Sequence, residues 1–209
     1  MKCLLCGRNV EASGSLRDLL FTDDQLCSRC RGAWIRKNQY FLVDHVKASS
    51  SWIYNDAFSD ALIQFKECGD EILKDVFLLP VKEHLHHRYR GYTLLLMPST
   101  QEKTEERGFS HLREMFECLD LPMMEPFIKE TSAVQKQLSR RQRQAMQHEI
   151  ILKPGIKLPK KIVLADDVMT TGSTIRGALN CINIKEHDVR IYVCAKVPEK
   201  NQEKEERIC

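Results

Sequence analysis

The segment 162–175 constrains this chain more than any other, because it combines a buried strand, a small polar turn and the start of a helix. Its apolar beginning, Ile162 to Ala165, predicts a short buried strand. After the turn, apolar residues recur with the spacing i, i+3, i+4 and i+7 of a helix's inner face: Ile175, Ala178, Leu179 and Ile182. The turn contains only small or hydroxylated residues: Thr170, Thr171, Gly172, Ser173 and Thr174. Successive backbone N–H groups in such a turn bind an anion at the helix N-terminus, so we expect a phosphate site in this 170–174 loop.

Two carboxylates, Asp166 and Asp167 (the acidic pair), directly follow the predicted strand. They stand at its carboxyl end, where open α/β sheets bind ligands. Acidic groups there hold sugar hydroxyls or, through water, a hard cation such as Mg²⁺. A phosphate beside a diol describes a ribose 5-phosphate. The alternative is an ordinary strand-to-helix turn capped by Thr or Ser, but a cap requires neither two acids nor five small residues in a row.

Four cysteines near the N-terminus form two Cys-x-x-Cys pairs: Cys3 with Cys6, and Cys27 with Cys30. A spacing of about twenty residues between such pairs is typical of a four-thiolate zinc ribbon. The residues between them are too few to build an adequate core, so a metal must supply the folding energy. Because four thiolates leave no open coordination position, we expect one structural zinc and no metal catalysis there.

Disulfides and redox chemistry are the alternatives for these cysteines. Met1-Lys2-Cys3 leads straight into the first pair, so we expect no secretion signal. The other five cysteines show no pairing pattern, which favours a reducing cytoplasm over an oxidised secreted scaffold. A redox Cys-x-x-Cys would need only one pair, within a βαβ unit.

Composition excludes some classes of protein and leaves nucleic-acid binding open. The longest apolar runs in the 209 residues are too short for a membrane span, so we expect no membrane insertion. The net charge is only +3, but the stretch 129–161 has a local excess of about seven positive charges, including Arg140, Arg141 and Arg143. A basic segment near the ribbon has two aromatic residues, Trp34 and Tyr40, interleaved with basic ones, a pattern compatible with stacking on unpaired bases. Its basic residues are Arg29, Arg31, Arg36 and Lys37. Solvated basic residues, with Trp34 anchoring the ribbon to the main domain, are the alternative.

The order of predicted elements indicates the fold. A strand pair at 40–46 and 48–54 precedes a helix that begins at Asn55, and a second helix runs from about 71 towards Gly91. There follow a strand at 92–97, a flexible loop at 99–106, a helix around 112–119, a strand near 126–128, a helix around 139–147 and a last strand at 189–193. Alternating strands and helices predict an α/β domain with a mostly parallel sheet and helices on both faces. We expect a zinc ribbon at 1–38, the α/β domain at 39–198 and a polar tail at 199–209.

The 162–174 segment closely resembles the phosphoribosyl pyrophosphate (PRPP) loop of type I phosphoribosyltransferases. Joined to a four-cysteine ribbon, it makes nearly the whole chain similar to the ComF family. Phe65-Lys66 before Gly69-Asp70, the run 106–110, and Gln135, Leu138 and Arg143 match further family elements. The chain departs from the family at three single positions: Ser110 and Met146 replace Asn, and Lys129 replaces Arg.

The resemblance implies a type I phosphoribosyltransferase fold, a role in moving single-stranded DNA into the cytoplasm, and a helicase-like ComFA partner. In a catalytic interpretation, the 170–174 loop holds the 5-phosphate and the acidic pair holds the ribose diol or hydrated Mg²⁺, while Arg107 and the stretch 140–143 neutralise the leaving pyrophosphate. No nucleobase pocket is evident in the sequence. Three hypotheses remain: a DNA-uptake factor that binds PRPP or a related 5-phosphate, a transferase with an unknown acceptor, and an adaptor whose site is vestigial. The intact acidic pair and 170–174 loop argue against the third.

Overall fold

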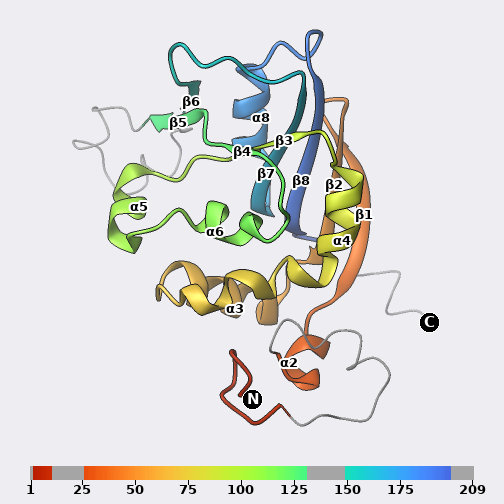
Figure 1. The fold of residues 1–209 in the computed structure, drawn as a ribbon, viewed down its shortest axis with the longest axis vertical. Helices are drawn as coiled ribbons and strands as arrows, with labels where there is room; N and C mark the ends of the chain where they lie inside the picture. Colours follow the sequence, from red (N-terminus) through yellow and green to blue (C-terminus); the bar gives the residue numbers. More distant parts are fainter. Residues whose placement is uncertain (1, 11–25, 131–148, 199–209) are drawn as a thin grey trace.

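The structure, a computed structural model, describes residues 2–10, 26–130 and 149–198. A six-stranded sheet forms the centre of the molecule, in the order β1-β2-β8-β7-β3-β4 (Figure 1). Its strands are β1 (Arg36–Val43), β2 (Val46–Ile53), β3 (Thr93–Leu96), β4 (Met123–Met124), β7 (Lys161–Met169) and β8 (Asp188–Lys196). Every neighbouring pair is parallel except the hairpin of β1 and β2. The mostly parallel α/β fold that the sequence predicts is therefore confirmed.

Helices cover both faces of this sheet. The helices of the described residues are α2 (Ser28–Gly32), which belongs to the N-terminal cysteine segment, α3 (Asp56–Lys66), α4 (Lys82–Arg88), α5 (Gln101–Arg107), α6 (His111–Glu117) and α8 (Ser173–Asn180), with 3-10 turns η2 (Glu71–Val76) and η3 (Leu79–Val81). A separate antiparallel pair, β5 (Phe127–Glu130) and β6 (Glu149–Leu152), lies beside α8. Its contact with α8 is close, because a Cβ added to Gly177 would come within 2.8 Å of Ile150.

The hairpin at the sheet's edge follows from its two-residue turn. Asp44 and His45 both have positive φ, 45° and 69°, as a type I′ turn requires. This turn suits the right-handed twist of the flanking strands and sets the register in which Val43 pairs with Val46. β2 then pairs in parallel with β8, which joins the hairpin to the rest of the sheet.

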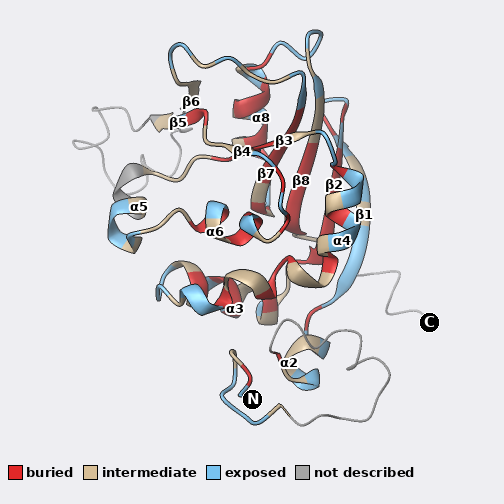
Figure 2. Ribbon diagram, in the orientation of Figure 1, coloured by how far each residue is buried: buried red, intermediate tan, exposed pale blue. Residues whose placement is uncertain are grey.

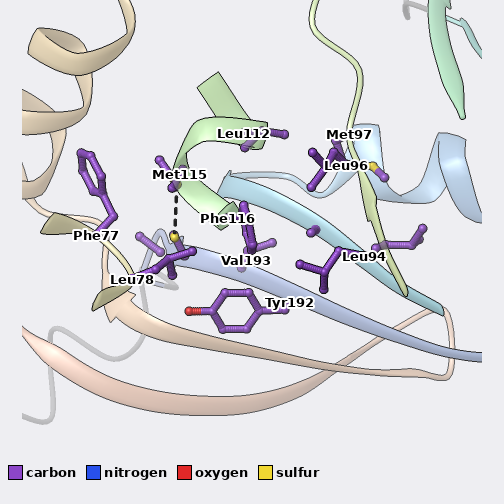
Figure 3. Close-up of a cluster of buried hydrophobic side chains, with 14 of the residues drawn as sticks. Phe77, Leu78, Leu94, Leu96, Met97, Leu112, Met115, Phe116, Tyr192 and Val193 are labelled. Carbon is purple, nitrogen blue, oxygen red and sulfur yellow. Dashed lines mark hydrogen bonds between the residues drawn. The ribbon is translucent and has the colours of Figure 1, made fainter. Parts of the chain in front are cut away.

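One large part of the core lies on the face of the sheet that α4 and α6 cover, and Ile175, Ala178 and Leu179 of α8 belong to the same buried cluster. Figure 2 shows the central strands and the inner sides of these helices as buried. Met115 and Phe116 of α6 pack on Tyr192 and its neighbours in β8 (Figure 3). The Sγ atom of Cys194 lies 3.5 Å from the sulfur of Met115. Since Tyr192 is opposite Ala165 in the register, the α6 side of β7 is the side of Ala165 and Asp167.

The N-terminal cysteine segment packs directly on the α/β domain. Trp34 is 5% exposed, and its ring lies 4.8 Å from Phe58 and 5.4 Å from Phe77, centroid to centroid. The guanidinium of Arg31 lies 4.6 Å from the Trp34 ring and donates a hydrogen bond to the carbonyl of Val76. Contacts therefore cross the boundary that the sequence places at residue 38.

Several predicted elements agree with the structure and two do not. Asn55 caps α3, since its side chain accepts a hydrogen bond from the N–H of Phe58. The single helix predicted after residue 71 is wrong, because η2, η3 and α4 replace it and Pro80 lies in η3. The loop predicted at 99–106 is also wrong, because α5 occupies most of that range. The helix predicted around 139–147 lies outside the described residues.

Within the described part of the chain, no helix has both the length and the apolar character needed to cross a membrane.

Candidate functional site at the carboxyl ends of β3 and β7

The sheet has a topological switch point between β3 and β7. From β3 the chain moves outward to β4, and from β7 it moves through α8 in the other direction to β8. The two strands pair only as far as Leu96 and Ala165, so the end of β7 projects past β3. Ligands of open α/β sheets bind in the crevice that such a reversal creates. The acidic pair and the 170–174 loop both lie at this end of β7.

The 170–174 loop has the geometry of an anion site. Gly172 has φ of 74°, a left-handed conformation that favours glycine, and α8 begins at the next residue. The guanidinium of Arg176 donates a 2.6 Å hydrogen bond to the carbonyl of Thr171, which links the loop to the first turn of α8. Thr170, Thr171 and Ser173 are exposed. The N–H groups in the first turn of α8 have no intrahelical acceptor and can bind an anion.

The acidic pair lies within β7 rather than beyond its end, because the strand continues to Met169. Consecutive residues of a strand point to opposite faces, so the two carboxylates face different surroundings. Asp167 faces α3 and α6: its Oδ2 atom lies 2.6 Å from Nζ of Lys66 and 3.0 Å from Nε2 of His111. Asp166 faces the side of α8, and its Oδ1 atom accepts a hydrogen bond from the N–H of Asp167.

A chain of polar side chains extends from Asp167 to α5. The Nδ1 atom of His111 lies 3.2 Å from Nη1 of Arg107 and 3.5 Å from Oγ of Ser99. Because a guanidinium can only donate, Nδ1 must accept, which leaves the imidazole proton on Nε2 facing Asp167. Nη2 of Arg107 pairs with Glu67 at 2.9 Å, and the arginine side chain is only 6% exposed. Its Nε atom is buried and has no hydrogen-bond partner in the described structure.

Sequence reasoning singled out Arg107 for the pyrophosphate but missed most of its partners. The guanidinium lies close to the acidic pair, yet Glu67 and His111 already engage two of its nitrogens. Lys66 is part of the Phe65-Lys66 segment that carries the ComF resemblance, so a signal for it existed. His111 is a single histidine at the start of α6, and only the tertiary structure brings it to Asp167.

The two carboxyl groups have opposite pKa shifts. Burial and the neighbouring charge of Asp167 raise the pKa of Asp166 from its ordinary 3.8 to about 8. Burial would raise the pKa of Asp167 too, but the hydrogen bond from His111 and the charge of Lys66 outweigh burial and lower it. Burial also lowers the pKa of His111, although its hydrogen bond to Asp167 opposes this. The two shifts mean that Asp167 ionises before Asp166 as the pH rises.

The four N-terminal cysteines form a second site. Their Sγ atoms all lie within 4.8 Å of one another, and those of Cys6 and Cys27 are 3.7 Å apart. Zn–S bonds of about 2.3 Å in a tetrahedron require sulfurs about 3.8 Å apart, so the cluster fits zinc. Burial raises the pKa of Cys3, but backbone hydrogen bonds from Cys27, Cys6 and Leu5 outweigh it and bring that pKa to about 6, which favours a thiolate. Burial and the neighbouring cysteines raise the pKa of Cys30 instead, so the fit to zinc rests on the sulfur distances. These four residues are positioned to hold a metal ion.

The structure describes Trp34 but not the predicted nucleic-acid contacts in the stretch 140–143. Trp34 cannot stack on a base in this structure, because its ring is buried among Trp52, Phe58 and Phe77. That prediction is wrong, and the alternative of an anchor between ribbon and domain describes Trp34 instead. The exposed aromatic of the same basic segment is Tyr40, which is 60% exposed with the guanidinium of Arg88 over its ring at 4.8 Å. Arg140, Arg141 and Arg143 lie outside the described residues.

Comparison with known proteins supports the family resemblance. The chain is 27% identical over 199 residues to the competence protein ComFC of Streptococcus pneumoniae, covering 84% of this chain and 90% of that protein. It is also 27% identical over 183 residues to ComFC of Bacillus subtilis, covering 86% of this chain and 70% of that protein. The resemblance to the ComF family inferred from the sequence is confirmed. No family model matches the chain.

Among solved structures, similarity is found to a hypoxanthine phosphoribosyltransferase from Staphylococcus aureus in two crystal forms. Each is 13% identical with a TM-score of 0.32; the alignments cover 68% of this chain and 76% and 75% of those chains. The fold described above rests on the strand order and pairing of this chain itself.

The raised pKa of Asp166 predicts a specific pH dependence of stability. Between about pH 4 and 8 this carboxyl is protonated in the folded chain and ionised in the unfolded chain, so unfolding releases a proton and stability falls as pH rises. Asp166→Asn should remove that component, and the variant's melting temperature should fall less than the wild type's from pH 5 to pH 8. Asp44→Asn, at an exposed carboxylate, is the matched control and should follow the wild type. Equal pH slopes for wild type and Asp166→Asn would contradict the shift.

Proposed function

We propose that this protein is a cytoplasmic factor in natural transformation that handles incoming single-stranded DNA and binds PRPP, or a related 5-phosphate, with Mg²⁺. The competence role comes from its similarity to the two ComFC proteins. The observation that carries the ligand is the 170–174 loop beside the acidic pair at the switch point. A helicase of the ComFA kind is the proposed protein partner.

The site's residues suit a phosphorylated ribose. The 5-phosphate would bind the first-turn N–H groups of α8 and the hydroxyls of Thr170, Thr171, Ser173 and Thr174. Mg²⁺ bound with PRPP would offset the charge of the diphosphate, and its positive charge would favour the ionised form of Asp166. The buried N–H of Arg107 Nε lacks an acceptor, which an oxygen of the diphosphate would supply.

The second candidate function is a catalytically active phosphoribosyltransferase with an unidentified nucleobase acceptor. The same residues favour it, because carboxylates beside the ribose would stabilise the positive charge that develops when pyrophosphate leaves. The two candidates differ in whether PRPP turns over.

Single-stranded DNA would contact the basic stretch 129–161 and the basic segment near the cysteine site. Of the first, the structure describes Lys129 in β5, Lys161 at the start of β7, and three lysines between β6 and β7: Lys153, Lys157 and Lys160. In the second, Tyr40 replaces Trp34 as the proposed stacking residue, because it is exposed.

Ligand binding is tested by thermal stability with a matched pair of glycine variants. PRPP with Mg²⁺, and ribose 5-phosphate, should raise the wild-type melting temperature, because both bind the folded chain. Gly172→Val should abolish this rise. Gly155→Val is the control, since Gly155 has the same φ of 74° and suffers the same backbone strain outside the 170–174 loop. An unchanged wild-type melting temperature at millimolar PRPP would contradict the proposal.

Single-stranded DNA binding should weaken steeply with salt. Each phosphate contact contributes roughly 0.7 to the slope of log K against log salt, so Arg140→Ala with Arg141→Ala should flatten that slope. Tyr40→Ala should weaken binding at all salt concentrations by about 1–3 kcal/mol. Pyrophosphate release from PRPP, Mg²⁺ and a panel of bases is followed in parallel. DNA binding without base-dependent release supports the uptake factor, whereas release with one base and no DNA affinity supports the transferase.

We further propose that the cysteine site holds one structural zinc. Protein purified without chelators under reducing conditions should contain about one zinc per chain, because there is one four-thiolate site. Chelation should shift tryptophan fluorescence to the red, since both tryptophans of the chain, Trp34 and Trp52, are buried where this segment packs. Most of the far-ultraviolet circular dichroism should remain, because the α/β domain has its own core. Metal content well below one per chain would contradict the zinc.

A further inference from the structure

The two carboxylates of the acidic pair differ in their hydrogen-bond and ion-pair partners. Both oxygens of Asp167 already have partners: Oδ2 takes Lys66 at 2.6 Å and His111 at 3.0 Å, and Oδ1 accepts the N–H of Val168 at 2.6 Å. The Asp167 side chain is 9% exposed. Among the described residues, the Asp166 carboxylate has a hydrogen-bond partner only at Oδ1, which accepts from the neighbouring backbone N–H. A ligand could therefore bind Oδ2 of Asp166 without breaking an internal ion pair.

We propose that Lys66 and His111 are positioning residues that bind the Asp167 carboxylate and give it a structural role. Asp166 alone then holds the ribose diol or hydrated Mg²⁺. This inference rests on the proposed function and assigns different roles to two acids that the sequence treats as equivalent. Asp167 contributes by holding the end of β7, and with it the N–H that orients the carboxylate of Asp166. The Asp167 carboxylate is buried, and an uncharged diol would not replace the positive charge of Lys66, so exchanging this partner for a ribose diol would leave the carboxylate uncompensated.

The network around Asp167 includes residues of three helices, α3, α5 and α6. Lys66 is the last residue of α3, and His111 is the first of α6. Arg107, at the end of α5, accounts for the tautomer of His111, and Glu67 holds Arg107 in turn. The position of Asp167 thus depends on segments from three parts of the chain that meet at β7.

The first arm of the test needs no ligand and no variant. Nitrogen-15 NMR of the wild-type imidazoles at neutral pH should show His111 as the neutral form with its proton on Nε2. A neutral imidazole with its proton on Nδ1 would overturn the inference, because Nε2 would then carry no proton to donate to Asp167.

The second arm is a double-mutant cycle on stability. Lys66→Met and Asp167→Asn should be strongly non-additive, with a coupling of at least tenfold in the unfolding equilibrium constant, about 1.4 kcal/mol. Lys157→Met, at an exposed lysine in the loop before β7, is the matched control and should combine additively with Asp167→Asn. If Asp167→Asn does not fold, His111→Gln replaces it in the cycle and should also couple to Lys66→Met. Additivity with Lys66→Met would overturn the ion-pair role.

The third arm measures the affinity for PRPP with Mg²⁺ by calorimetry. Asp166→Asn should weaken binding at least tenfold with little loss of stability, whereas Asp167→Asn should cost stability and change the affinity of the folded fraction less than threefold. Equal losses of affinity in both variants would overturn the division of roles. Failure of the wild type to bind PRPP would instead contradict the proposed function, and the first two arms would still decide how Asp167 is held.

Discussion

Placing two adjacent carboxylates, Asp166 and the buried Asp167, at the end of a central strand is the constraint on which the rest of this structure depends. β7 is paired on both sides, and its residues from Ile162 to Ala165 are fully buried. Carboxylates that follow such a run can ionise together only at high cost. Lys66 and His111 offset the charge of Asp167, and the proton on Asp166 avoids the second charge. The two acids therefore differ before any ligand arrives.

This constraint links the site to the helices on one face of the sheet. α3, α5 and α6 each contribute a group to the network that ends on Asp167. The network also brings Arg107 close to the ligand site, with Glu67 and His111 holding it. A ligand that binds at the switch point meets a surface already organised by these contacts, which reduces the ordering it must cause.

The cysteine segment depends on the domain as much as on its metal. Trp34 and Arg31 insert between this segment and α3, and they pack against Phe58, Phe77 and Trp52. The same indole cannot serve a nucleic acid, because burial in this contact removes both ring faces from solvent. A metal at the cysteines and the aromatic contacts would thus stabilise one another, since both hold the same short segment in place.

The sequence by itself determined the local features of this protein, because periodicity, turn chemistry and cysteine spacing are local. It predicted the strand-loop-helix at 162–182, the cap at Asn55, the four-cysteine cluster and the mostly parallel sheet. Only the tertiary structure decided that Trp34 is buried, since an aromatic among basic residues has the same pattern whether it anchors or stacks. Only the tertiary structure also separated Asp166 from Asp167. Their partners come from residues 66 and 111, and long-range contacts of this kind leave no periodic trace in the chain.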